Sequence, residues 1–308
     1  MLIPVTTIAL DMETVFTTIY ILVDDWYRAQ GQMLLNGKAG AKPVFSDSEL
    51  LTLMLAHDYL PYPGETQYLA YIRANYGRLF PKLANQRQYN RRARGLRKLV
   101  EALRVWWLTQ LAVTRPTAVL VDTKSVPGVN VTRHKRHSAF SCSAAYGYCT
   151  ARKLYYFGYK LVMLCTPDGL PMLYDLVPAN TDERVAAEAA LFQSENVLLI
   201  GDKGFIGQTW QAVIADETGN TWFNPKRANQ HDQNDPPLEA DRMGMADRER
   251  IEGLFHQLQN TGRNLERLLA KTIVGLATRL VLKVTSIVLR LLLAQRFNFD
   301  ILAFSILH

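Results

Sequence analysis

Cysteine is scarce in this chain of 308 residues, which contains only Cys142, Cys149 and Cys165. Three cysteines form no even-numbered disulfide framework, so a reducing compartment is expected. Cys142 and Cys149 lie near His134 and His137, but their spacing fits no compact zinc motif. Neither a disulfide scaffold nor a structural zinc site is therefore predicted.

Long uncharged apolar runs are also missing. The apolar stretch 268–307 is interrupted by charged residues at positions 271, 279, 283 and 290, so none of its runs reaches the roughly 18 residues that a membrane span requires. Positions 1–10 lack a basic region ahead of their apolar residues, which argues against a signal peptide. We therefore expect a cytoplasmic protein, associated with the nucleoid if it binds DNA, and no membrane partner.

Acidic residues are fewer than basic ones: 28 Asp and Glu stand against 35 Lys and Arg, and the formal net charge is +7. The excess is local, because it gathers in the segments 87–104 and 133–137. Such basic patches are typical of nucleic-acid-binding proteins, although solvated helix and loop faces also produce them. The residues of these patches that we predict to contact DNA are Arg91, Arg92, Arg94, Arg133, Lys135 and Arg136.

Residues 1–114 are predicted to form an all-helical domain that binds DNA. Apolar residues recur at helical spacing, and the capping-type residues of 46–49 precede one of the helices. A turn rich in proline and glycine at 61–64 ends that helix. The helices expected in this domain span 11–30, 50–60, 66–80 and 85–112.

Residues 115–308 are predicted to form a second, catalytic domain with C-terminal helices. Short apolar runs alternate with helical patterns there, and Asp168-Gly169 between two such runs is a strong hairpin signal. This order predicts a mixed α/β sheet with helices on its faces. The strands expected are 118–121, 154–165, 170–177, 197–200 and 221–223. The helices expected are 181–192, 209–215, a series from 246 onward and 272–295, with loops over 122–150 and 228–245.

Two aspartates directly follow apolar runs that are typical of buried strands. Asp122 follows the run 118–121, and Asp202 follows 197–201 and precedes Lys203-Gly204. Ligands gather at the carboxyl ends of strands in open α/β sheets, so both carboxylates are expected at that edge. Either aspartate alone is also explained as an ordinary turn residue.

A third carboxylate, Glu252, is predicted to lie on a helix. At about 100° per residue, the apolar residues at 251, 254, 255 and 258 form one stripe that packs on the sheet. Glu252 and Arg248 lie along one edge of this stripe, whereas Glu249 points further toward solvent. Glu252 is therefore placed to reach the sheet, although a surface ion pair between Arg248 and Glu252 is a plainer interpretation. Three acids of this kind suit two divalent cations on a phosphodiester, and oxygen ligands select Mg²⁺ or Mn²⁺.

Asp122, the Asp202-Lys203-Gly204 box and Arg248-x-x-x-Glu252 together resemble the DDE transposases of bacterial insertion sequences. The resemblance covers about 117–292. It implies an RNase H-like fold, and cleavage and transfer of double-stranded DNA at terminal inverted repeats. It also implies that the three acids are catalytic and hold two Mg²⁺ or Mn²⁺ ions.

The resemblance departs from the usual pattern at two positions. Many relatives have a Tyr three residues before the Arg and a Lys seven residues after the Glu, whereas this chain has Met245 and Gln259. Arg263, one turn further on, is a candidate to replace that lysine in orienting the transposon end. Lys124, Lys203 and Arg248 are expected to bind DNA phosphates, which makes binding salt-dependent.

Two other functions remain open at this point. A haloacid-dehalogenase-type phosphatase also has a nucleophilic Asp at the end of its first strand, but it usually carries a second Asp where this chain has Lys124. A transposase relative that binds DNA without cleaving it is the other alternative, which the departures at Met245 and Gln259 keep open. If the chain is an active transposase, we expect a homodimer on DNA, because two transposon ends must be handled together.

Overall fold

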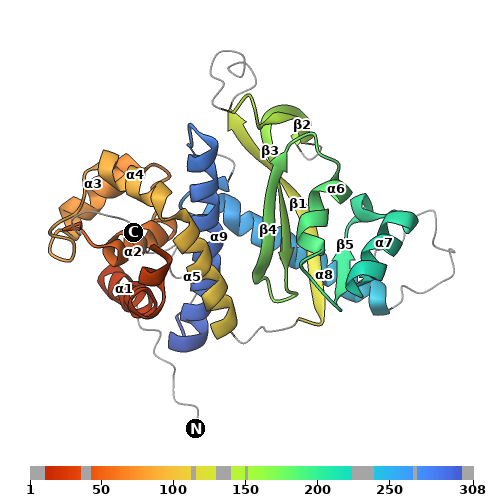
Figure 1. Cartoon of the computed structure of the whole chain (residues 1–308), viewed down its shortest axis with the longest axis horizontal. Coiled ribbons are helices and arrows are strands. Elements are labelled where there is room, and N and C mark those ends of the chain that lie inside the picture. The colour runs from red at the N-terminus through yellow and green to blue at the C-terminus, as the bar shows by residue number, and fades with distance from the viewer. Residues whose placement is uncertain are drawn as a thin grey trace, which may run out of the picture. The chain divides into compact units, whose positions relative to one another are not determined.

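The computed structural model describes residues 11–35, 43–111, 116–129, 140–149, 152–223, 239–265 and 269–299, without the side chains of Val129, Lys203 and residues 239–249. The chain divides into two compact units, which Figure 1 shows with the elements labelled. Unit 1 is Met1–Ala112, Thr261–Asn264 and Ala277–His308, and unit 2 is Val113–Asn260 and Leu265–Leu276. The first boundary lies close to the predicted one. Most of the C-terminal helix, expected in the catalytic domain, belongs to unit 1.

Unit 1 is built from helices, as predicted for its N-terminal part. Asp11 caps the first helix by accepting a hydrogen bond from the Thr14 N–H at 2.7 Å, and Ser46 and Glu49 form a reciprocal capping box at the start of the second. One long helix over 85–112 was expected, but the chain forms two, because it leaves helical geometry at Leu96 after Gly95. The helices are α1 (Met12–Ala29), α2 (Asp47–Ala56), α3 (Glu65–Asn75), α4 (Gln86–Gly95), α5 (Arg97–Gln110) and most of α9 (Ile273–Phe297).

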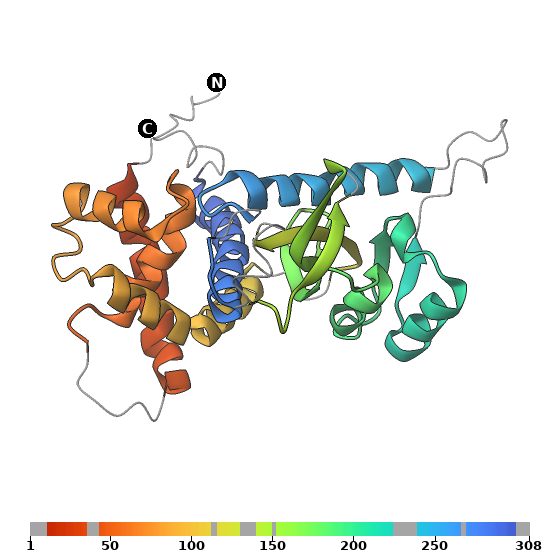
Figure 2. The ribbon, with the colours of Figure 1, turned by 90° about the horizontal axis from the view of Figure 1, so that it is seen from above.

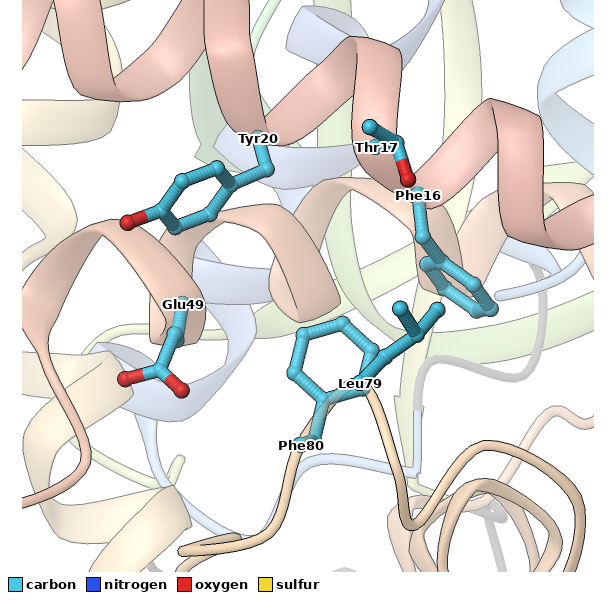
Figure 3. Close-up of a pocket in the computed structure, with 6 residues that line it drawn as sticks. All are labelled: Phe16, Thr17, Tyr20, Glu49, Leu79 and Phe80. Carbon is cyan, nitrogen blue, oxygen red and sulfur yellow. The ribbon is translucent and has the colours of Figure 1, made fainter.

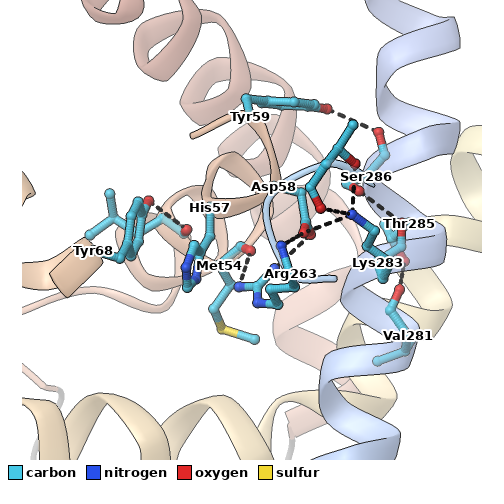
Figure 4. Close-up of polar contacts among 12 residues, drawn as sticks. Met54, His57, Asp58, Tyr59, Tyr68, Arg263, Val281, Lys283, Thr285 and Ser286 are labelled. Carbon is cyan, nitrogen blue, oxygen red and sulfur yellow. Dashed lines mark hydrogen bonds and ion pairs between the residues drawn. The ribbon is translucent and has the colours of Figure 1, made fainter. Parts of the chain in front are cut away.

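A buried ion cluster holds segments of unit 1 that are far apart in sequence (Figure 4). Arg263 Nη1 lies 2.6 Å from Asp58 Oδ2, and its Nη2 donates to the Met54 carbonyl at 2.7 Å. Lys283 Nζ lies 3.5 Å from Asp58 Oδ1 and also donates to the carbonyl and hydroxyl oxygens of Thr261. Burial lowers the pKa of Lys283 to about 8. Two cations thus share one carboxylate in the interior.

Unit 2 contains a mixed sheet of six strands in the order β2-β3-β1-β5-β6, with β4 also paired to β3. β1, β5 and β6 are parallel, whereas β1, β2 and β4 pair with β3 in antiparallel fashion. The predicted loop over 122–150 was wrong in two places: β1 continues to Val129, and β2 is a strand. The strands are β1 (Ala118–Val129), β2 (Ala145–Cys149), β3 (Leu154–Cys165), β4 (Pro171–Pro178), β5 (Leu198–Gly201) and β6 (Thr221–Phe223).

Helices cover both faces of this sheet (Figure 2). Val119 and Val121 of β1 belong to the core beneath α6 (Glu183–Leu191) and α7 (Gln208–Thr218). On the opposite face, α8 (Glu239–Asn260) buries the predicted apolar stripe, which is at most 3% exposed. The loop expected up to 245 was wrong from 239 onward, because Glu, Ala, Met and Arg there are strong helix formers. The sheet order and its flanking helices make an RNase H-like fold.

No helix in the described ranges is long and apolar enough to cross a membrane.

Candidate active site

Asp122 had been predicted to lie at the end of a strand, but it lies in the middle of β1. The parallel pairing of β1 with β5 ends at Val121 and Gly201, whereas the antiparallel pairing with β3 continues through Asp122 and Met163. Asp122 therefore lies where β5 leaves the sheet. The apolar run before Asp122 correctly predicted the part of β1 that pairs with β5. The residues after Asp122 are polar, so the part of β1 that pairs only with β3 was not predicted.

Asp202 is the residue that follows β5. In the register that pairs Val121 with Gly201, the next positions are Asp122 and Asp202, and neighbouring strands lie about 4.8 Å apart. The N–H of Gly204 donates to Asp202 Oδ1 at 2.7 Å. Phe205, fully buried in the core, anchors the turn that follows. The fold therefore brings the two predicted aspartates side by side.

Other acidic groups lie close enough to Asp122 to affect its pKa. Burial, together with the negative charges of Asp202 and Glu183, raises the pKa of Asp122 to about 7. A hydrogen bond from its neighbour's backbone, Thr123 N–H to Asp122 Oδ1 at 2.6 Å, and the charge of Lys124 act in the opposite direction. The carboxylate is thus held among like charges.

Glu252 lies on α8, the helix that packs on β1 and β5. The ammonium group of Lys124, which shares a face of β1 with Asp122, is 5.8 Å from the centre of the Phe255 ring of this helix. Arg250 Nη1 donates to the Pro167 carbonyl at 2.7 Å in the turn between β3 and β4, which fixes the helix along the sheet. Glu252 itself is exposed. Within the described part of the chain, no three Asp, Glu, His or Cys residues are grouped closely enough to hold a metal ion.

Comparison with known proteins decides the family. The model of the family described as transposase DDE domain matches residues 114–289, which is more than half of the chain. This chain is a member of the DDE-domain transposases. No curated protein and no solved structure gives a significant match. Membership places the transposase among enzymes that act on DNA, and it removes the support for the phosphatase alternative.

Transposases of this family typically use divalent metal ions. The residues of this transposase fit such an ion in two respects. Asp122 and Asp202 offer hard oxygen ligands. The repulsion that raises the pKa of Asp122 is also of the kind that a bound cation relieves.

The basic residues predicted to contact DNA have different surroundings in the transposase. Arg91 and Arg94 are exposed on α4. Arg92 instead donates to Asp47 Oδ1 at 2.7 Å and to the Phe45 carbonyl at 2.6 Å, so its guanidinium group stabilises unit 1. Arg133, Lys135 and Arg136 lie outside the described residues, as do the side chains of Lys203 and Arg248.

Arg263 is not available to orient a transposon end. Its side chain is 3% exposed and is engaged by Asp58 and Met54, so the proposal that it replaces the family lysine is wrong for this structure. Gln259 is partly buried on α8, and the side chain of Met245 lies outside the described part of the transposase. Arg263 therefore does not compensate for the departures from the family pattern.

One carboxylate near the aspartates was missed in the sequence. Glu183, in the first turn of α6, accepts a hydrogen bond from the Thr123 hydroxyl at 3.0 Å. In the sequence it is only one residue of the helix expected at 181–192, and acidic residues are common in the first turn of a helix. The approach of α6 to Asp122 depends on the tertiary fold, so no local pattern could have revealed it.

A pocket of about 300 Å³ lies elsewhere, in unit 1 (Figure 3). Aromatic and aliphatic side chains dominate its lining, and Glu49 is its one charged residue. One oxygen of Glu49 already accepts the Ser46 N–H at 2.7 Å in the capping box. The lining residues are Phe16, Thr17, Tyr20, Glu49, Leu79 and Phe80. A lining without basic residues does not suit DNA phosphates.

Proposed function

We propose that this transposase cleaves DNA strands at the terminal inverted repeats of its element and transfers the cleaved ends to target DNA. Asp122, Asp202 and Glu252 are the proposed catalytic acids. The observation that carries the proposal is the strand register, in which Asp202 follows the last residue paired with β1 and so neighbours Asp122. The packing of α8 on the same two strands supports the third acid.

Asp122, Asp202 and Glu252 are also the proposed ligands of Mg²⁺ or Mn²⁺. When bound, divalent ions would activate the attacking oxygen and stabilise the leaving oxygen in an in-line displacement at phosphorus. Lys124 lies two residues beyond Asp122 on the same face of β1, so its proposed role is to bind a phosphate of the strand being cut. Lys203 and Arg248 are proposed for neighbouring phosphates.

Further DNA contacts are proposed for the basic residues outside this group. Arg91 and Arg94, which are exposed, are the candidates in unit 1. Arg133, Lys135 and Arg136 are candidates in the segment after β1. Dimerisation on DNA is proposed because paired ends must be cut and joined in one reaction.

The test uses labelled duplex DNA that carries the ends of the element, incubated with Mg²⁺ or Mn²⁺. Wild-type protein is expected to cut at the ends, whereas Asp122→Asn, Asp202→Asn and Glu252→Gln should lose at least about 100-fold in rate. Glu195→Gln, which removes an exposed carboxylate at the opposite end of β5, is the matched control and should cut normally. Undiminished cleavage by any of the three acid variants would contradict its assignment. DNA binding without cleavage by the wild type would instead favour a non-catalytic relative.

A further inference from the structure

Glu183 touches the two segments that carry the aspartates. One of its oxygens, Oε1, accepts the hydrogen bond from the Thr123 hydroxyl at 3.0 Å. Thr123 is the neighbour of Asp122 and, because side chains alternate along a strand, it faces α6 while Asp122 faces α8. Glu183 therefore binds β1 from the side of the sheet opposite to the Asp122 side chain.

The other oxygen of Glu183 reaches the segment of Asp202. Oε2 occupies the space in which a Cβ atom at position 204 would lie, so a larger residue there would displace the Glu183 carboxylate. A Cβ atom at this position would also lie 3.0 Å from Asp202 Oδ1. Gly204 is thus enclosed by two carboxylates, and its absence of a side chain allows Glu183 to approach Asp202.

The charge of Glu183 has no basic partner in the part of the chain that the structure describes. The neighbouring Arg184 pairs with Asp182, at 3.3 Å, and not with Glu183. The N-terminus of α6 favours a negative charge in its first turn, worth roughly 0.3–1 kcal/mol at an exposed site. This explains why an acid is tolerated at position 183, but it does not explain a carboxylate that spans the two aspartate segments.

We propose that Glu183 is a fourth carboxylate of the active site, a positioning residue that holds the segments of Asp122 and Asp202 together and adds negative charge for binding the divalent cation. This inference rests on the proposed function, because it assumes that the two aspartates bind the ion. Partners of metal ligands typically change metal affinity by about 10- to 100-fold when they are removed. A comparable effect is expected for Glu183.

The experiment measures Mn²⁺ binding to the full-length protein without DNA, by the electron paramagnetic resonance signal of free Mn²⁺. Glu183→Gln keeps the size of the side chain and an oxygen that accepts the Thr123 hydroxyl, but it removes the charge. We expect its Mn²⁺ affinity to fall about 10-fold. Thr123→Val removes the hydrogen bond and keeps the charge, so a smaller loss is expected. Glu195→Gln removes an exposed charge from the same unit and should bind Mn²⁺ as the wild type does.

Wild-type affinity in Glu183→Gln would overturn the inference, because a purely structural role is preserved by this substitution. If Glu183→Gln does not fold, Glu183→Asp takes its place, since the shorter side chain keeps the charge but cannot span both segments. Unchanged affinity in that variant would equally overturn the proposal. Asp122→Asn distinguishes the role of Glu183 from the proposed metal site. Weaker Mn²⁺ binding in Asp122→Asn with normal binding in Glu183→Gln refutes only the role of Glu183. Normal binding in both variants refutes the proposed metal site itself.

Discussion

Removing the carboxylate of Asp58 tests the buried ion cluster of unit 1. Asp58→Ala would leave the side chains of Arg263 and Lys283, which are 3% and 0% exposed, without their anion. Breaking a buried ion pair from one side costs about 3–5 kcal/mol, because the remaining charge stays in a medium of low polarity. Two cations lose one partner here, so we expect a loss of about 5 kcal/mol in the free energy of unfolding. A loss of that size is a large fraction of the roughly 5–15 kcal/mol that stabilises a typical protein.

The measurement is urea-induced unfolding of the full-length protein, followed by tryptophan fluorescence. Trp26 and Trp107 are buried in unit 1 and report its unfolding. The matched control is Asp24→Ala, because Asp24 pairs with Arg28, whose side chain is 70% exposed. The side chain of Asp24 is 14% exposed, but because the guanidinium group of Arg28 stays in solvent, this pair should contribute less than about 1 kcal/mol.

A triple variant separates unpaired charge from lost packing. Asp58→Ala combined with Arg263→Met and Lys283→Met removes both cations together with their anion, and it should recover much of the lost stability. A loss in Asp58→Ala no larger than in Asp24→Ala would refute the argument from buried charge. A triple variant as unstable as Asp58→Ala would show that the loss arises from packing.

Three further predictions concern pH, a helix cap and a glycine. Because burial lowers the pKa of Lys283 from 10.5 to about 8, the unfolded chain binds more protons between these values, and stability rises with pH there. From pH 8 to 9.5 this rise amounts to about 1.5 kcal/mol in urea unfolding, and Lys283→Met should abolish it; an unchanged slope would contradict the assignment. Ser46→Ala should lower stability by about 1 kcal/mol in the same assay, because it removes the cap of α2, and no loss would argue against the capping box. Gly204→Ala should lower the rate of DNA cleavage about 10-fold with an unchanged circular dichroism spectrum, because the new methyl group displaces the Glu183 carboxylate and crowds Asp202; full activity would contradict that crowding.

The packed face of α8 was the most predictable feature near the proposed site. Helical phasing alone indicated that Leu254, Phe255 and their neighbours pack on a sheet and leave Glu252 at the edge of the packed face. The structure confirms the buried stripe, whereas Glu252 is exposed and its role as the third acid stays a prediction. Periodicity sufficed here because the face of a helix is a local property of its sequence.

Strand boundaries were less predictable. β2 was mistaken for loop because its five residues, Ala145–Cys149, include a glycine and follow a basic, serine-containing segment. The end of β1 was misplaced because Asp122, Thr123 and Lys124 are polar, yet they are held in the sheet by pairing with β3. Such pairing is a tertiary effect that overrides local preference.

The two units are interwoven along the chain, which passes from one unit to the other after Ala112, Asn260, Asn264 and Leu276. A gene truncated shortly after the codon for Glu252 would still encode all three proposed catalytic acids. Its product would nevertheless lack Arg263 and Lys283, and with them both cations that neutralise Asp58. A truncation before Arg263 would therefore spare the proposed catalytic acids and yet remove the cations that Asp58 binds among the N-terminal helices.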